Sequence, residues 1–284
     1  MKRFILKALL FFSVVVGIFS MILLFYGSYV DYFYEKFTSP KASSMIIGDS
    51  RALQGIQPQV INQNLVNQNI SLPMFNYSFT IAQSHIGPLY RKSILKKIDK
   101  KTTNGLFILA LNPWMFGSKK TNNNYKGEFK ELGQPPHNMN YVSMNPNFEY
   151  LIKNLNFFHF KGVFRKSSKL HKNGWLEETN LPSDQNVFND WKNNQLKIFN
   201  GFIKNYKVSK YRMKSLDTLV KNLKKYGEIA IVRTPIDEEM LNLEKTFFKD
   251  FDKFMYEISE SNNIHYFNFT QSNLKNIKLM MVII

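Results

Sequence analysis

The sequence predicts an α/β protein in which helices cover both faces of a parallel β-sheet, preceded by one N-terminal transmembrane helix. Three observations predict this fold class. Residues 8–26 form an uncharged run, short apolar runs recur along the chain as strands, and amphipathic segments of helical spacing separate those strands. The composition agrees, since 44% of the 284 residues are hydrophobic and 15% are aromatic, which excludes a mainly disordered chain.

The N-terminal segment predicts an uncleaved membrane anchor. Basic residues at positions 2, 3 and 7 precede about 19 uncharged residues, and a helix of that length spans roughly 28 Å, close to the thickness of a bilayer core. Signal-peptide cores are shorter and end at small residues, whereas this run ends in aromatic ones. A cleaved signal is the alternative. The basic flank predicts a single-pass protein of the inner (cytoplasmic) membrane whose C-terminal domain is extracytoplasmic.

The chain is strongly basic, with 38 Lys and Arg against 21 Asp and Glu, a net charge of +17. Two basic runs, 96–101 and 221–225, fall on predicted amphipathic helices, where a solvated helix face is the simplest interpretation. The alternative is attraction to anionic lipid headgroups or to an acidic glycan. No nucleic-acid motif accompanies the charge. We therefore expect contact with membrane lipid through the N-terminal helix, an acylated or anionic glycan as substrate, and no nucleic acid.

The chain contains no cysteine, which excludes a disulfide scaffold, a cysteine nucleophile and a thiolate metal site. The histidines are not spaced with carboxylates as metal ligands, and neither a Walker loop nor a dinucleotide-binding glycine pattern occurs. We expect neither a metal nor a cofactor.

Apolar runs and helical periodicity divide the soluble part into elements. The strands predicted in chain order are 44–47, 75–79, 106–111, 228–232 and 265–269. The predicted helices are 85–101, 213–223 and one long helix over 240–258. This pattern gives a cytoplasmic flank and anchor (1–28), a juxtamembrane linker (29–42) and an α/β domain (43–284) with an insertion at about 113–205.

The insertion is too long for a simple loop and carries scattered aromatic residues. One interpretation is a lid over the carboxyl ends of the strands that would hold substrate specificity. The other is that its aromatic residues pack together and close a small core of their own.

One motif carries the candidate chemistry. Gly48-Asp49-Ser50 follows the first buried strand and precedes a helix. A serine at that point exposes its hydroxyl above the sheet, and its backbone N–H joins a helix N-terminus that can stabilise an oxyanion. Gly48 permits a tight turn, and the Asp49 side chain can form hydrogen bonds with the backbone of the loop. The alternative is an ordinary strand-to-helix turn with a capping serine.

The motif in this position resembles the SGNH (GDSL-type) hydrolase superfamily, in particular its membrane-anchored acyltransferase and esterase members that act in the cell envelope. The resemblance covers about residues 43–112 and 228–270. It implies a flavodoxin-like three-layer sandwich, Ser50 as nucleophile, and Asn112, after the third strand, as an oxyanion donor. The family's glycine after the second strand is missing, and Asn76 or Ser78 is the substitute that we expect in contact with substrate.

The resemblance also implies an Asp-x-x-His after the last strand, but residues 271–284 contain no carboxylate and no imidazole. A serine without a base is a weak nucleophile, so we expect an impaired enzyme. The apolar end, 279–284, indicates a shortened or frame-shifted chain, and a natural pseudoenzyme is the alternative. Another histidine could replace the missing base, but His265 begins a strand and so lies at the N-terminal edge of the sheet, away from Ser50. The remaining histidines are His85, His137, His159 and His171, and for each of them a packing or surface role is the simpler interpretation.

Two arginines complete the candidate site. Arg51 follows Ser50, and Arg233 follows the fourth strand, so both lie at carboxyl ends of strands, where they can hold an anionic group. A salt bridge to Asp49 or Asp237 is the simpler alternative.

Two functions remain after these observations. The first is a membrane-anchored serine ester hydrolase or O-acyltransferase that acts on an acylated substrate outside the membrane. The second is a non-catalytic, membrane-tethered domain of the same fold that binds a glycan or a partner.

Overall fold

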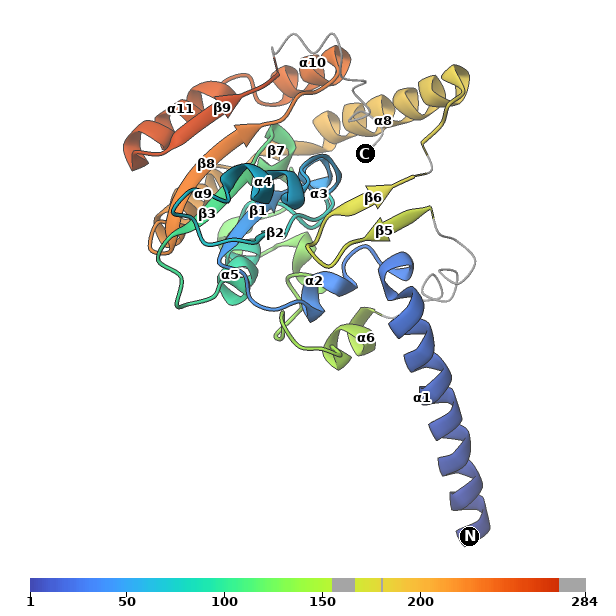
Figure 1. Ribbon diagram of the computed structural model, residues 1–284. Helices are drawn as coiled ribbons and strands as arrows, with labels where there is room; N and C mark the ends of the chain where they lie inside the picture. The colour runs from blue at the N-terminus through green and yellow to red at the C-terminus, as the bar shows by residue number, and fades with distance from the viewer. Residues whose placement is uncertain (155–166, 180, 271–284) are drawn as a thin grey trace.

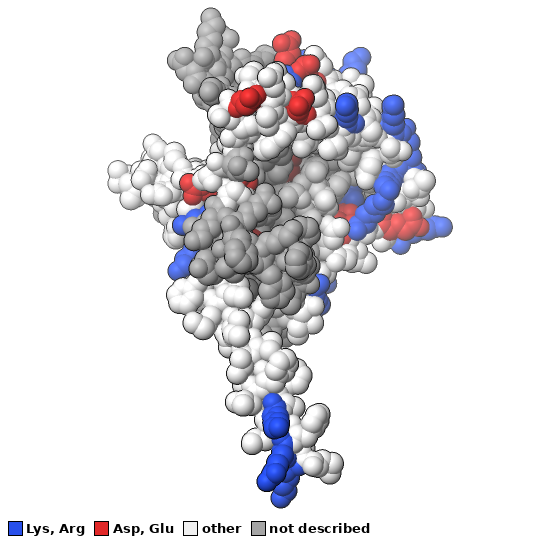
Figure 2. Space-filling model, turned by 90° about the vertical axis from the view of Figure 1, so that its right-hand side faces the viewer, with Lys and Arg blue, Asp and Glu red and all other residues white. Residues whose placement is uncertain are grey.

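The computed structural model describes residues 1–154, 167–179 and 181–270 (Figure 1). Helix α1 (Lys2–Val30) projects from the domain and carries the N-terminus at its far end. Its segment Lys2–Ile22 is long and apolar enough to cross a membrane. Figure 2 shows Lys and Arg side chains at the far end of α1 and then a length of helix without charged side chains. The predicted N-terminal apolar helix is therefore present.

Five parallel strands form the central sheet, in the order β2-β1-β3-β8-β9. The strands are β1 (Ser44–Gly48), β2 (Met74–Asn76), β3 (Gly105–Ala110), β8 (Gly227–Arg233) and β9 (His265–Asn268). Gly48 pairs with Ala110, and Ala110 pairs with Val232, so the carboxyl ends of β1, β3 and β8 meet at one edge. The predicted α/β class with a parallel sheet is confirmed.

Helices cover both faces of the sheet because its strands bury apolar residues on both sides. Alternate positions, such as Ile47 and Leu109, belong to the larger core under α5 (Pro88–Lys97), α9 (Lys210–Leu223) and α11 (Phe251–Asn262). The intervening positions, such as Ile46 and Ala110, face α3 (Ser50–Gly55) and α4 (Pro58–Leu65) in a smaller core.

The segment directly after α1 is part of the larger core. Helix α2 (Tyr34–Thr38) buries Phe37 and Lys36 completely. The ammonium of Lys36 donates to the backbone oxygens of Asn76 and Gly174, and Lys97 donates to the oxygens of Lys36, Ser39 and Val142 at 2.7–2.8 Å. These two lysines therefore link α2 to the sheet and to the insertion.

The described part of the insertion contains several short elements and one long helix, and it packs against the rest of the domain. They are η1 (Pro113–Phe116), β4 (Gly117–Lys119), η2 (Asn124–Lys126), η3 (Lys130–Gly133), α6 (Phe148–Asn154), β5 (Ser168–Leu170), β6 (Leu176–Glu178) and α8 (Gln185–Asn205). Strand β4 pairs with β7 (Tyr206–Val208), and β5 pairs with β6 in a hairpin. The Trp114 ring lies 4.6 Å from Phe199 of α8 and 5.0 Å from Phe247, so the insertion shares its aromatic core with the C-terminal part of the domain.

Three predicted elements differ from the structure. The long helix expected over 240–258 is two helices, α10 (Glu238–Phe247) and α11, because their apolar faces pack into different clusters, one around Trp114 and one on the sheet. The strand expected over 75–79 ends at Asn76. The helix expected over 85–101 is only Pro88–Lys97, since Ile98 is extended and bridges to Ala42.

Candidate functional site

The Gly48-Asp49-Ser50 turn joins β1 to α3 at the carboxyl edge of the sheet. A Cβ atom at Gly48 would lie 2.7 Å from Ala52 Cβ and 2.8 Å from Ala110 O, so only glycine allows this close approach. Asp49 caps α3, accepting a 3.1 Å hydrogen bond from the backbone N–H of Arg51. Ser50 is the first residue of α3 and is partly exposed. The structure thus places Ser50 where the sequence predicted it.

Asn112 lies beside this turn, at the end of the segment that continues β3. Its Nδ2 donates a 2.6 Å hydrogen bond to Asp49 Oδ2, and its Oδ1 accepts from the backbone N–H of Trp114 at 3.2 Å. The amide nitrogen carries two hydrogens, and one of them is directed to Asp49. The structure therefore brings the Asp49-Ser50 pair and Asn112 together.

The Asp49 carboxyl group is almost completely buried and is held on both oxygens. Burial raises the pKa of Asp49, while the nearby Arg51 guanidinium and the Asn112 amide oppose that rise. This arrangement fixes the loop after β1 rather than offering a free carboxylate to a substrate.

Asn76 is the last residue of β2, Ser78 follows two residues later, and both are fully buried. The Asn76 amide donates to the backbone oxygens of Ala52 and Ile56, at 2.7 and 3.0 Å, and accepts from the Ser78 backbone N–H. Ser78 Oγ lies 3.5 Å from Ile46 O. Asn76 therefore attaches β2 to α3, and in this conformation both side chains bond to backbone atoms of the protein.

Arg51 and Arg233 share one buried carboxylate. Arg51 Nη1 lies 2.7 Å from Glu244 Oε1, Arg233 Nη2 lies 2.9 Å from Glu244 Oε2, and Arg233 Nη1 lies 2.6 Å from Asp252 Oδ2. Salt bridges, the simpler alternative for these arginines, are thus present, but their partners are Glu244 and Asp252 rather than Asp49 or Asp237. Although burial disfavours the charge, pairing with Glu244 and Asp252 raises the pKa of Arg233.

Glu244 is the site residue that the sequence analysis missed. It is completely buried, and it lies four residues after Met240 on the buried face of α10. The sequence did contain a signal for Glu244, because helical spacing assigns this position to the core. A carboxylate buried there requires a partner of opposite charge.

Two of the histidines, His85 and His137, lie in a polar cluster with Arg212 of α9 and Glu131 of η3. Arg212 donates to both oxygens of Glu131, at 2.8 and 3.2 Å, and His85 and His137 lie next to this pair. Burial, followed by the charge of Arg212, lowers the pKa of His85 to about 4. Burial also lowers the pKa of His137, whose Nε2 lies 2.7 Å from Gln83 O.

His171 lies on the β5–β6 hairpin, which packs against α3. The Trp175 indole donates a 2.7 Å hydrogen bond to Gln54 O, and His171 stacks on Trp175 with 4.8 Å between ring centroids. His171 Nε2 lies 2.8 Å from Glu177 Oε2. His265 begins β9 and is exposed, as predicted for the opposite edge, and His159 lies outside the described residues.

Within the described ranges, no group of three or more His, Asp or Glu side chains is arranged to hold a metal ion. No protein-family model, no curated protein and no solved structure matches this chain.

Proposed function

We propose that this protein is a membrane-anchored serine ester hydrolase or O-acyltransferase that acts on an acylated substrate of the cell envelope. In this proposal α1 is a single-pass anchor in the inner membrane and the domain is extracytoplasmic. The strand order β2-β1-β3-β8-β9 supports a flavodoxin-like three-layer sandwich, because that fold orders its five strands as 2-1-3-4-5.

The observation that carries the proposal is the Asp49–Asn112 hydrogen bond beside a partly exposed Ser50. It joins the loops after β1 and β3 at the edge where ligands bind in sheets of this type. Ser50 Oγ would attack the acyl carbonyl and displace the alcohol of the substrate ester, which leaves with the proton that the general base has taken up. Water or an acceptor hydroxyl would then release the acyl group from Ser50. The backbone N–H of Ser50 and the second N–H of the Asn112 amide would stabilise the tetrahedral oxyanion.

A general base must accept the proton of the Ser50 hydroxyl. Our candidate is His171, because its hairpin packs against α3 and Glu177 holds its Nε2, which leaves Nδ1 to accept the proton. This assignment replaces the Asp-x-x-His that the C-terminal sequence lacks.

A fluorophosphonate probe tests the proposal on the full-length chain in detergent. We expect the parent protein to be labelled, Ser50→Ala to lose the label, and Ser143→Ala, which removes an exposed serine of the insertion, to keep it. His171→Ala should slow labelling about a hundredfold, whereas His265→Ala should not. Labelling that persists in Ser50→Ala would exclude Ser50 as the nucleophile.

The second candidate function is a non-catalytic tethered domain that binds a glycan or a partner. The pairing of Arg51 and Arg233 with Glu244 favours it, since a purely structural role explains both arginines. A parent protein that takes up no probe while it remains folded would select this function.

A further inference from the structure

Helix α6 exposes apolar side chains on the outside of the domain. Phe148 is 62% exposed and Ile152 is 85% exposed, and they lie four residues apart on one side of the helix. The opposite side of α6 is buried, since Tyr150 and Leu151 belong to the larger core. The orientation of α6 is therefore fixed, and its exposed apolar side cannot turn inward.

The same helix is held next to the end of α1. The Tyr150 hydroxyl donates to both oxygens of Asp31, the residue that follows α1, at 2.7 and 2.8 Å. Phe19 of α1 packs against the core cluster to which Tyr150 belongs. Figure 1 shows α6 at the lower end of the domain, beside the upper part of α1.

Helix α1 is longer than a bilayer core is thick. Its 29 residues span about 43 Å, whereas a bilayer core is about 30 Å thick. The segment that is long and apolar enough to cross the core, Lys2–Ile22, ends before Asp31, and Phe19, near the end of that segment, contacts the core of the domain. In a membrane crossed by α1, the domain, and α6 with it, is therefore held at the bilayer surface.

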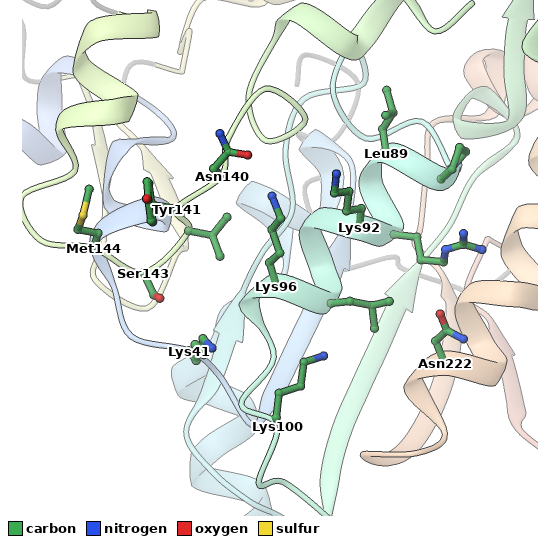
Figure 3. A pocket seen from close by; sticks show the side chains of 14 residues that line it. Lys41, Leu89, Lys92, Lys96, Lys100, Asn140, Tyr141, Ser143, Met144 and Asn222 are labelled. Atoms are coloured by element: carbon green, nitrogen blue, oxygen red, sulfur yellow. The ribbon is translucent and has the colours of Figure 1, made fainter. Parts of the chain in front are cut away.

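A basic groove adjoins α6. It has a volume of about 1000 Å³, and its wall at 140–144 leads directly into α6. Figure 3 shows Lys92, Lys96 and Lys100 one after another on one side of the groove, with Tyr141, Ser143 and Met144 on the other. The cations of the groove are Lys41, Arg91, Lys92, Lys96 and Lys100.

The positive charge of this groove is only partly offset within the described residues, by Glu149 of α6, whose charge acts on Lys96. Its lining contains no Asp or Glu, and no carboxylate of the described ranges lies within 4 Å of its five cations. A concave surface of one sign focuses the field and attracts counter-charges. Phosphate groups at the surface of a bilayer supply that charge next to α6.

We propose that this end of the domain is a lipid-contact surface, formed by Phe148 and Ile152 together with the adjoining basic groove. The two apolar side chains enter the interfacial layer of the membrane, and the groove binds the headgroups of anionic lipids. This inference rests on the proposed anchoring of α1, and it adds that the domain itself sits on the bilayer.

Site-specific fluorescence tests the apolar part on the full-length chain in lipid nanodiscs. Because the sequence has no cysteine, Ile152→Cys gives a single site for an environment-sensitive dye. The control is Tyr256→Cys, since Tyr256 is 52% exposed and belongs to α11. Figure 1 shows α11 on the side of the domain opposite to the free end of α1. Lipid-borne quenchers should reduce emission from position 152 several-fold and leave position 256 unchanged.

Equal quenching at the two positions in protein that stays in the nanodiscs would overturn the lipid-contact surface. Protein that fails to enter the nanodiscs at all would instead overturn the anchoring by α1, so the two failures are distinguishable.

Charge reversal tests the groove. In phosphatidylglycerol-rich nanodiscs, compared with phosphatidylcholine alone, emission from position 152 should shift further to the blue. Lys41→Glu with Lys92→Glu, two exposed groove positions, should remove most of that difference. Lys245→Glu with Lys249→Glu, exposed at and beyond the end of α10, should preserve it. An unchanged lipid response in the groove variant would contradict headgroup binding and favour a soluble polyanion as the occupant.

Discussion

Asn112 Nδ2 donates a 2.6 Å hydrogen bond to Asp49 Oδ2, and this bond connects the loops after two adjacent strands, β1 and β3. Both side chains are almost completely buried, at 2% and 4% exposure. The bond therefore positions the loop that carries Ser50, whatever chemistry Ser50 performs.

Removal of this donor should destabilise the domain. In Asn112→Ala the buried Asp49 carboxylate loses one of its hydrogen bonds, and we expect a loss of about 1–3 kcal/mol in the free energy of unfolding, because buried acceptors without a donor carry their full desolvation cost. Urea unfolding measures it. Asn242→Ala, at an exposed position of α10, is the control and should change stability by less than about 0.5 kcal/mol. Equal stability of the two variants would contradict the role assigned to Asn112.

Glu244 should be the most sensitive charged residue of the site. Glu244→Gln removes the negative charge that Arg51 Nη1 and Arg233 Nη2 share. Breaking a buried ion pair from one side costs about 3–5 kcal/mol, so we expect a loss of that size in chemical unfolding. The matched change Glu238→Gln, exposed on the same helix, should be nearly neutral. A cost below about 1 kcal/mol for Glu244→Gln would show that solvent already screens the network.

His85 should make the domain sensitive to acid. Burial and then Arg212 lower its pKa from 6.5 to about 4 in the folded state. Between those values the unfolded chain binds a proton that the folded chain does not. The contribution of His85 to stability is therefore complete above pH 6.5 and decreases as the pH falls toward 4. The slope is at most about 1.4 kcal/mol per pH unit from this residue.

Thermal unfolding across this pH range tests the role of His85. His85→Gln should flatten the slope, and the slope that is left should come in part from His137, whose pKa is lowered in the same direction. His265→Gln, at the exposed start of β9, should leave the profile of the parent protein. A parent profile that is flat from pH 6.5 to 4 would exclude a neutral, buried His85.

Lys97 should make the stability of the domain depend on pH in the alkaline range. Burial lowers its pKa from 10.5 to about 7, so the unfolded chain binds the additional proton between these values. Stability should therefore rise with pH from about 7 toward 10.5. Lys97→Met should reduce this rise, and the part that is left should come from Lys36, whose pKa burial also lowers. The exposed Lys100→Met should retain the full rise, as measured by urea unfolding at pH 7 and at pH 9. A parent stability that is constant over this interval would contradict the prediction.

The strands of the sheet, and the closeness of the loops that carry Ser50 and Asn112, could be predicted from the sequence. Continuous apolar runs specify strands that are buried on both faces, and residues that directly follow parallel strands meet at one edge. Asp49 and Asn112 could therefore be predicted as neighbours from their positions alone. Whether Ser50, Asn76, Ser78 and the arginines contact a substrate stays a prediction.

The partners of the arginines could not be predicted, because an ion pair depends on how α10 lies across the strand ends. The stripe from Met240 to Ile258 has the spacing of one helix, yet α10 ends at Phe247 and α11 begins at Phe251. This break lets Glu244 face Arg51 and Arg233 while Asp252 approaches Arg233 from the next helix. Local periodicity contains no information about such a break when apolar residues continue through it.

The connection between α1 and α2 has a mechanical consequence. Only three residues, 31–33, separate the two helices, and Lys36 joins α2 to the sheet and the hairpin. If α1 is the membrane anchor and Ser50 the nucleophile that we propose, such a short connection holds Ser50 at one nearly fixed distance from the lipid surface. A substrate polymer would have to be presented at that height, and its attachment point in the membrane, as well as its chemistry, would decide whether it is modified.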